Sequence, residues 1–170
     1  TVHESLFGIR TDRTYEGAQS SGMEGDLASD TNSLVAEAVL PLSLQQPSMA
    51  EWYWQETSTQ YGSAFHFINS NDNLELALGT QNPQWQAWDG TGDNDEIWAA
   101  NGYDRWIYYE VTFDWSNGTY DYYMEDLQTG DTRTGTRSLK HGVDVAKIGL
   151  GERPGSTNRH YTWWDKITIK

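Results

Sequence analysis

The sequence contains no cysteine, which excludes both a disulfide framework and a metal site built from thiolates. No apolar run approaches the roughly 20 residues that a helix needs to cross a bilayer, so we expect no membrane insertion. Nothing at the N-terminus resembles a signal peptide, and the chain begins abruptly with TVHESLF. The 170 residues fit one domain, and we expect a mature or excised module of a larger protein.

Basic residues are scarce, since 11 Lys and Arg stand against 25 Asp and Glu and the formal net charge is −14. A surface of this sign repels phosphate backbones, which excludes nucleic acid as a partner, and it disfavours anionic membranes and strongly anionic polymers. Two explanations of the acidity stay open. One is an ordinary acidic domain that is secreted or displayed at the cell surface. The other is a protein of a high-salt organism, in which dense carboxylates keep the chain hydrated while ions screen their repulsion.

Aromatic residues, in contrast, are abundant. Nine Trp and ten Tyr are far more than the core of a small domain needs. Some of these rings must therefore lie at or near the surface, where large flat apolar groups usually mark a binding site.

Most of the chain alternates apolar and polar side chains as β-strands do, with turn clusters between the alternating runs. In residues 50–56, Trp52 and Trp54 share one face of the expected strand. Residues 32–40 fit either a strand or a short helix, and Pro41 follows them. Many short strands with regular turn signals predict an all-β sandwich or barrel. The clearest strands are expected at 50–56, 63–69, 73–79, 106–115, 119–125 and 163–170.

Asn117 and Gly118 separate two alternating runs, and this dipeptide in that setting is the strongest short-range signal for a β-hairpin. One face of the hairpin is expected to pack in the core, and the other to form a mixed aromatic and acidic surface. In the last strand, Ile167 and Ile169 are expected to face inward. The expected core face comprises Tyr109, Val111, Phe113, Tyr120, Tyr122 and Met124, and the expected surface comprises Tyr108, Glu110, Thr112, Asp121, Tyr123 and Glu125.

Four segments, in this order, resemble a laminin-G-like domain within the wider group of concanavalin A-like lectins and glucanases: YEGAQS, DRWIYYEVTFDWSNGTYDYYMEDLQTG, KIGLGERPG and WWDKITI. In that group a Trp opens a long strand, an Asp ends it, a hairpin follows, and the last strand carries an Asp. Here these positions are Trp106, Asp114, residues 119–125 and Asp165. The resemblance implies a single β-jelly-roll domain of two antiparallel sheets over residues 1–170. It implies the fold better than the function, because this fold hosts lectins, carbohydrate-binding modules, glucanases, lyases and adhesion domains.

The same resemblance implies a structural calcium ion held between the first strand, an early loop and the last strand. Calcium prefers several oxygen ligands from carboxylates and backbone carbonyls. Carried onto this sequence, the ligands are Glu4, the carbonyl of Gly17, and Asp165. A second candidate for calcium is the Gly-rich loop DGTGDNDE, although a solvated acidic turn explains that loop more simply. Its acidic residues are Asp89, Asp93, Asp95 and Glu96.

Two glutamates are candidates for catalysis, because glucanases of this fold carry the pattern Glu-x-Asp-x-x-Glu on one strand. Glu51 and Glu56 have the matching spacing, but Tyr53 stands where the Asp is expected. Residues five apart face opposite sides of a regular strand, so the two carboxylates can approach to the ~5 Å of retaining hydrolysis only across a bulge. A lyase would need clustered basic groups, and the four histidines are dispersed along the chain.

Sugar binding needs only an aromatic ring that stacks on the pyranose and neighbouring polar groups that hydrogen-bond its hydroxyls. The sequence supplies both kinds of group in NPQWQAWDG, in GYDRW and in the hairpin. The candidate sugar-binding residues are Trp85, Trp88, Asp89, Tyr103, Arg105, Tyr108, Glu110, Tyr123 and Trp54.

We therefore expect a non-catalytic module that binds polysaccharide and belongs to a secreted or cell-surface protein, with a catalytic domain as a candidate neighbour in the parent chain. The first alternative is a small polysaccharide hydrolase or lyase of the same fold. The second is a structural or adhesion domain of a surface protein or virion, whose aromatic residues would lie in a protein interface.

Overall fold

The computed structural model describes residues 6–10, 15–17, 20–25, 34–56, 61–81, 84–88, 94–98, 104–152 and 160–170. These ranges hold strands β1–β13 and one short 3₁₀ helix, η1 (Leu42–Leu44). None of the described helical residues forms a helix long and apolar enough to cross a membrane. The strands are β1 (Leu6–Arg10), β2 (Ser20–Gly25), β3 (Leu34–Val39), β4 (Met49–Glu56), β5 (Tyr61–Ile68), β6 (Leu74–Gln81), β7 (Gln84–Trp88), β8 (Asn94–Trp98), β9 (Ile107–Asp114), β10 (Thr119–Asp126), β11 (Thr132–Ser138), β12 (Lys147–Glu152) and β13 (His160–Ile169).

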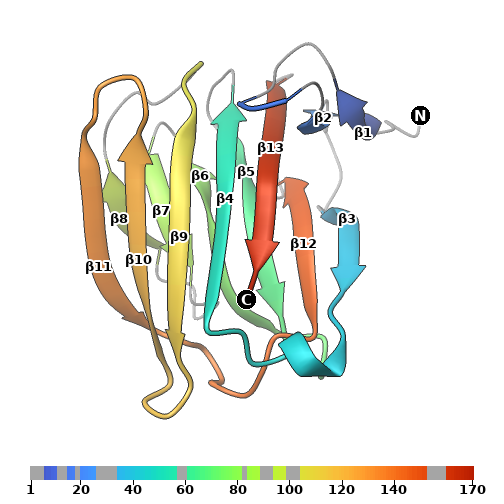
Figure 1. Cartoon of the computed structure of the whole chain (residues 1–170), viewed down its shortest axis with the longest axis vertical. Helices are drawn as coiled ribbons and strands as arrows, with labels where there is room; N and C mark the ends of the chain where they lie inside the picture. Colours follow the sequence, from blue (N-terminus) through green and yellow to red (C-terminus); the bar gives the residue numbers. More distant parts are fainter. Residues whose placement is uncertain are drawn as a thin grey trace.

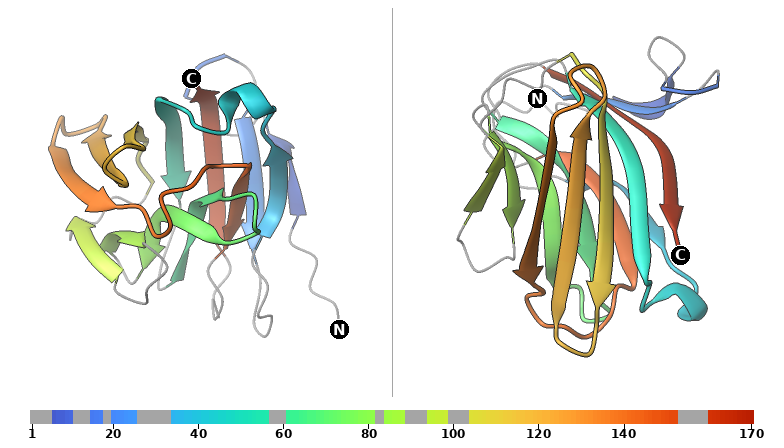
Figure 2. Two further views of the ribbon diagram at one scale, coloured as in Figure 1. Left: turned by 90° about the horizontal axis from the view of Figure 1, so that it is seen from below. Right: turned by 60° about the vertical axis from the view of Figure 1, so that its left-hand side comes forward.

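The strands form two antiparallel sheets that pack face to face (Figure 1). One sheet has seven strands in the order β1-β2-β13-β4-β9-β10-β11, and the other has six in the order β3-β12-β5-β6-β7-β8. Both layers can be followed from two further directions in Figure 2. The expected all-β sandwich of two antiparallel sheets is confirmed, and the segment that fitted either a helix or a strand is strand β3.

Aromatic rings dominate the core between the sheets. Trp52, on β4, stacks on Phe65 of the opposite sheet at a centroid distance of 4.3 Å and on Tyr109 of β9 at 5.1 Å. Trp54, two residues further along β4, points the same way and is 0% exposed. Its assignment to a sugar-binding surface is therefore wrong, because the six-stranded sheet covers the face that it shares with Trp52.

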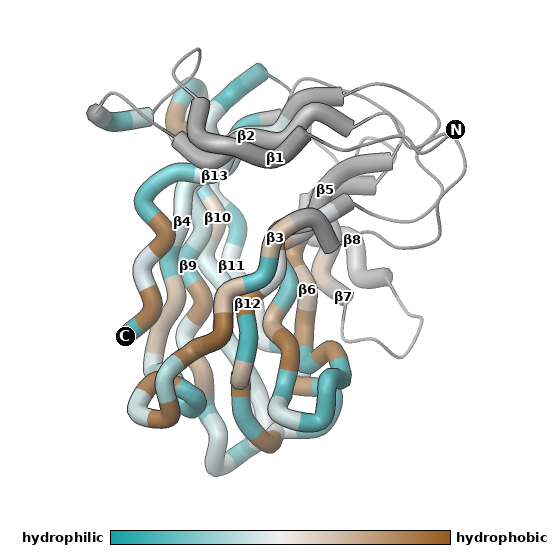
Figure 3. Tube along the Cα trace, turned by 90° about the vertical axis from the view of Figure 1, so that its right-hand side faces the viewer, coloured by the Kyte–Doolittle hydropathy of each residue, from teal (hydrophilic) through white to brown (hydrophobic). Residues whose placement is uncertain are grey.

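The β9–β10 hairpin has the two faces that its alternation predicts. All six residues of the expected core face are at most 7% exposed, whereas their neighbours on the other face are partly or fully exposed. Figure 3 shows how hydrophobic and hydrophilic residues follow one another along the described part of the chain. The period of two therefore determines which side chains of this hairpin are available at the surface.

A bulge in β13 separates two parts of that strand. Asp165 pairs with Tyr53 of β4, and Thr168 pairs with Glu51, so β13 has one more residue than β4 between these pairs. Lys166 lies within this bulge and has a φ of 49°. The extra residue lets Trp164 and Ile167 both pack on the core, while Asp165 lies on the opposite face.

Candidate functional site

The outward side of the seven-stranded sheet carries a compact set of tyrosines and glutamates from β4, β9 and β10. On the face of the sheet that points away from the core, Tyr108 of β9 pairs with Tyr53 of β4 and with Glu125 of β10. Two residues further along β9, Glu110 pairs with Glu51 of β4 and with Tyr123 of β10. We call this surface the tyrosine–carboxylate face. It consists of Glu51, Tyr53, Tyr108, Glu110, Tyr123 and Glu125.

Hydrogen bonds between tyrosine hydroxyls and carboxylates connect this face. The Tyr108 hydroxyl oxygen lies 3.1 Å from Glu51 Oε2 and 3.0 Å from Glu110 Oε2. A phenol has one proton, so Tyr108 can donate to only one of these carboxylates at a time. The Tyr123 hydroxyl donates to Glu125 Oε2 at 2.9 Å.

These contacts determine which groups on the face are charged. Burial, followed by hydrogen bonds to Glu110 and Glu51, raises the pKa of Tyr108 far above its usual value. The hydrogen bond to Glu125 is the main cause that raises the pKa of Tyr123. The hydrogen bond from Lys170, whose Nζ lies 3.1 Å from Glu51 Oε1, lowers the pKa of Glu51. At neutral pH the face therefore combines uncharged aromatic rings with an ionised carboxylate.

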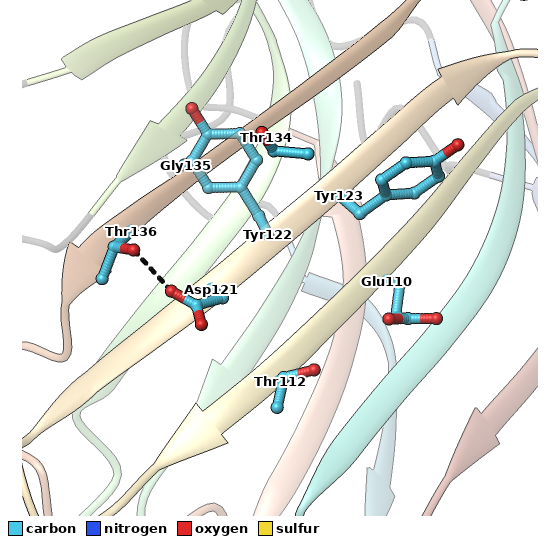
Figure 4. Close-up of a pocket in the computed structure, with 8 residues that line it drawn as sticks. All are labelled: Glu110, Thr112, Asp121, Tyr122, Tyr123, Thr134, Gly135 and Thr136. Atoms are coloured by element: carbon cyan, nitrogen blue, oxygen red, sulfur yellow. Dashed lines mark hydrogen bonds between the residues drawn. The ribbon is translucent and has the colours of Figure 1, made fainter.

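An open pocket of about 390 Å³ adjoins this face on its β11 side (Figure 4). Within it, the Thr136 hydroxyl donates to Asp121 Oδ1 at 2.5 Å. The pocket offers an aromatic ring, two carboxylate groups and three threonine hydroxyls to a ligand. Its lining comprises Glu110 and Thr112 from β9, Asp121, Tyr122 and Tyr123 from β10, and Thr134, Gly135 and Thr136 from β11.

Residues 15–17 lie against the other side of the face. The Tyr15 ring stacks on Tyr53 with a centroid distance of 3.9 Å and an interplanar angle of 14°, and it lies 6.1 Å from the Trp106 ring. Asp165 Oδ2 accepts hydrogen bonds from the backbone N–H groups of Tyr15 at 3.0 Å and Glu16 at 3.3 Å. Tyr15 is 40% exposed, so it extends the aromatic surface beyond β4.

The contacts of Asp165 do not fit a calcium ligand. Besides the two N–H groups of residues 15 and 16, the N–H of Lys166 donates to Asp165 Oδ1 at 2.8 Å, and the Lys166 ammonium pairs with Glu16. Calcium needs about six to eight oxygen ligands, and N–H donors oppose a cation. Within the described ranges, no three His, Cys, Asp or Glu side chains converge as a metal site would require. Glu4 lies outside the described residues, so the calcium site of the sequence analysis is untested, and the N–H donors around Asp165 are an argument against it.

The proposed catalytic pair on β4 lacks the bulge that it would need. Glu51 belongs to the tyrosine–carboxylate face, and Glu56 pairs with Thr162 of β13. The extra residue near Glu51 is in β13 and not in β4. Because β4 is regular between the two glutamates, the geometry does not favour Glu51 and Glu56 as a pair.

Arg105, expected beside the sugar, holds the β10–β11 turn together. Its guanidinium donates to Asp126 Oδ2 at 2.5 Å, and the Asp126 side chain is 1% exposed. Asp126 Oδ1 also accepts hydrogen bonds from the backbone N–H groups of Gln128 and Thr129. Arg105 therefore neutralises a buried carboxylate.

The remaining sequence candidates do not belong to the same sheet. Trp85 and Trp88 lie on β7, and Asp95 and Glu96 lie on β8, all in the six-stranded sheet. Trp85 and Trp88 therefore cannot share one sheet face with Tyr108. The structure does not describe the side chains of these four residues, and Asp89, Asp93 and Tyr103 lie outside the described residues altogether.

The sequence analysis missed Tyr53 and Tyr15 as parts of the aromatic surface. The alternation of residues 50–56 placed Tyr53 opposite the two tryptophans, which was a usable signal. Tyr15 gave no such signal, because its contact with Tyr53 joins segments that are far apart in the chain.

Neither a protein-family model nor a curated protein matches this sequence. Several solved structures resemble the fold. The cellulose-induced protein Cip1 is 12% identical, with a TM-score of 0.62 over 99% of this chain and 86% of that one. The glycoside hydrolase family 131 catalytic domain from Coprinopsis cinerea is 11% identical, with a TM-score of 0.56 over 90% of this chain and 70% of that one. A tetrameric galectin from the ball sponge Cinachyrella sp. is 10% identical, with a TM-score of 0.53 over 79% of this chain and 97% of that one. The chain therefore has the lectin-like β-sandwich fold that galectins share with glycoside hydrolase domains.

Proposed function

We propose that the chain is a non-catalytic carbohydrate-binding domain that uses the tyrosine–carboxylate face and the adjoining pocket. One observation carries this proposal: the partly exposed rings of Tyr108 and Tyr123 lie beside Glu110, with their centroids 6.1 Å apart. Such rings present flat apolar surface to the C–H face of a pyranose. The carboxylates and threonine hydroxyls around them can pair with sugar hydroxyls.

The shape of the site agrees with this role. A volume of about 390 Å³ is at the lower end of the range of small-ligand sites, which suits one or two sugar units better than a deeply enclosed ligand. The acceptor-rich lining suits a ligand with many hydroxyl donors. The lectin-like fold supports a glycan partner without identifying it.

Four further features belong to this proposal. The chain is a single module of a secreted or cell-surface protein, and a catalytic domain is its neighbour in the parent chain. Its family type is the laminin-G-like domain, and its acidity is suited to high salt. An increase in melting temperature from low to molar salt would support the last feature, whereas a flat response would remove it.

The test is a glycan array followed by calorimetry on the best ligand. We expect Tyr123→Ala to weaken binding by about tenfold or more, because the ring supplies most of the stacking area. Leu42→Ala, at a residue that is 86% exposed and remote from the face, is the matched control and should bind like the wild type. If no glycan binds, or if Tyr123→Ala binds normally, the proposal fails.

Glycoside hydrolysis is a second candidate because of one specific observation. Glu51 and Glu110 are cross-strand partners, and both have a carboxylate oxygen about 3 Å from the Tyr108 hydroxyl. These two oxygens are therefore no more than about 6 Å apart, close to the ~5–5.5 Å separation in retaining glycosidases. New reducing ends from a bound polymer, absent with Glu110→Gln, would establish hydrolysis, and an unchanged polymer length would exclude it.

A further inference from the structure

The charge in and around the pocket is one-sided. Of the eight lining residues, Glu110 and Asp121 are acidic, and none is Lys, Arg or His. Glu51 and Glu125 add two carboxylates on the adjoining tyrosine–carboxylate face. The Lys170 ammonium contacts Glu51 on the β13 side of this face, away from the pocket.

Three other cations of the described residues pair with carboxylates outside the pocket. Lys147 contacts Asp72 at 2.5 Å, Lys166 pairs with Glu16, and Arg105 binds Asp126. Arg133 and Arg137 belong to β11, the strand that supplies Thr134 and Thr136 to the pocket. Their guanidinium groups donate to the carbonyls of Thr132 at 2.6 Å and Thr136 at 3.1 Å, and Arg137 lies 5.7 Å from the centroid of the Tyr122 ring. In the register of β10 and β11 the two arginines stand opposite Met124 and Tyr120, whose side chains face the core. By the alternation of the strand, the side chains of Arg133 and Arg137 leave β11 on the side away from Glu110 and Asp121, so the residues that line the pocket carry a net negative charge.

The pocket carboxylates make hydrogen bonds with hydroxyl groups. Glu110 accepts from Tyr108 at 3.0 Å, and Asp121 accepts from Thr136 at 2.5 Å. A hydroxyl donates a hydrogen bond but does not cancel a charge, and a carboxylate has about four lone-pair positions. The Tyr123 ring beside them adds a π-face, which attracts cations. Together these groups form an acceptor for a ligand that carries ammonium groups among many hydroxyls.

We propose that the glycan bound here is a cationic polymer of amino sugars with free amines. This inference rests on the proposed function and specifies its ligand. An amino-sugar ring can stack on Tyr123 while its ammonium lies near Glu110 and Asp121. Polyuronates and sulfated glycans meet repulsion at the same place, and a neutral glycan loses the contribution of the ion pair.

The test compares four ligands by calorimetry with the full chain at low ionic strength: a glucosamine oligomer, its fully N-acetylated counterpart, a neutral glucan oligomer and a polyuronate. We expect the free-amine oligomer to bind about tenfold more tightly than its acetylated counterpart. Glu110→Gln should reduce this preference about threefold. Glu37→Gln removes the same charge from β3 of the other sheet and should leave the preference unchanged.

Each other outcome overturns the inference, and the outcomes differ in what remains. Equal or tighter binding of the acetylated or neutral oligomer removes the cationic ligand but leaves carbohydrate binding intact. Absence of binding to all four ligands removes both proposals. An equal effect of Glu37→Gln and Glu110→Gln would assign the preference to the net charge of the chain. If a lysine peptide displaces the free-amine oligomer and binds more tightly, the natural ligand is a basic protein segment.

Discussion

Glu75 should be one of the most important polar residues for stability, because it is a fully buried carboxylate at a bulge. Between Phe67 and Ile68 of β5, the partner strand β6 contains Glu75 as an extra residue, and its exposure is 0%. Its side chain accepts hydrogen bonds from Asn69 Nδ2 at 2.8 Å and from the backbone N–H groups of His141 and Gly142, both at 2.9 Å. Glu75 thereby connects the β5–β6 turn to the segment before β12.

The change Glu75→Gln keeps the size and removes one acceptor. The glutamine oxygen can still accept from His141 and Gly142, but its NH₂ group then faces Nδ2 of Asn69. Asn69 cannot rotate to help, because its Oδ1 already accepts from the N–H groups of residues 71 and 73. Two buried amide donors that face each other without an acceptor, together with weaker hydrogen bonds from the N–H groups of His141 and Gly142, should cost about 2–4 kcal/mol of unfolding free energy.

Urea unfolding followed by tryptophan fluorescence measures this cost. A loss of about 2–4 kcal/mol is a large part of the ~5–15 kcal/mol typical of a domain, and it lowers the melting temperature of a chain of this length by roughly 4–15 °C. Glu37→Gln is the matched control, since the Glu37 side chain is 41% exposed and its distance to Lys147 Nζ is 3.9 Å. We expect the control to stay within about 0.5 kcal/mol of the wild type.

A compensating change makes the test sharper. In the double variant Asn69→Asp with Glu75→Gln, the new carboxylate accepts from residues 71 and 73 and from the amide of the introduced glutamine, so every hydrogen bond is restored. The double variant should therefore be more stable than Glu75→Gln alone, with a coupling energy of about 1 kcal/mol or more. A Glu75→Gln variant as stable as the control, or a double variant with no recovery, would refute the network.

Three further predictions concern single sites. Burial lowers the pKa of His66 to about 4, so as the pH falls below ~6.5 the unfolded chain binds a proton that the folded chain does not. Between about pH 7 and pH 4.5 the wild type should therefore lose up to ~3 kcal/mol more unfolding free energy than His66→Gln, and parallel curves of unfolding free energy against pH would contradict this. A chelator should leave the melting temperature of the wild type unchanged, whereas Asp165→Asn should lower it because it weakens the hydrogen bonds to the N–H groups of residues 15 and 16. A chelator that lowers the melting temperature of the wild type but not of Asp165→Asn would instead establish calcium binding. A Cβ at Gly135 would lie 2.5 Å from the Tyr122 hydroxyl oxygen, so Gly135→Ala should lower the unfolding free energy by ~1–3 kcal/mol. In a Tyr122→Leu background this loss should disappear, and a loss that persists there would show another cause.

The sequence alone was sufficient to predict the β9–β10 hairpin and its two faces. Both follow from local rules, the Asn-Gly turn and the period of two, which need no knowledge of the rest of the chain. The inward positions of Ile167 and Ile169 were also predicted, and both residues pack against the core. The bulge at Lys166, which makes these positions compatible with a buried Trp164, was not predicted, because it depends on pairing with β4.

The features that the sequence did not reveal share a cause, because the environment of each residue comes from distant segments of the chain. Trp54 was placed correctly beside Trp52, but alternation does not say which face of a strand the second sheet covers. Arg105 gave no sign that Asp126 would bind it. Glu75 lies between two leucines of an alternating run, and only the fold brings residues 139–142 over it.

The position of β13 inside its sheet bears on how the chain folds. β13 pairs with β2 on one side and with β4 on the other, although it is the last of the described strands to be synthesised. The Trp54–Trp164 contact, with ring centroids 6.2 Å apart, forms only when this strand arrives. Such late, non-local pairing raises contact order and slows folding. During synthesis on the ribosome, β4 therefore keeps one edge unpaired until residues 160–169 have emerged. An unpaired strand edge can pair with another chain, so this stage of folding is prone to misassembly.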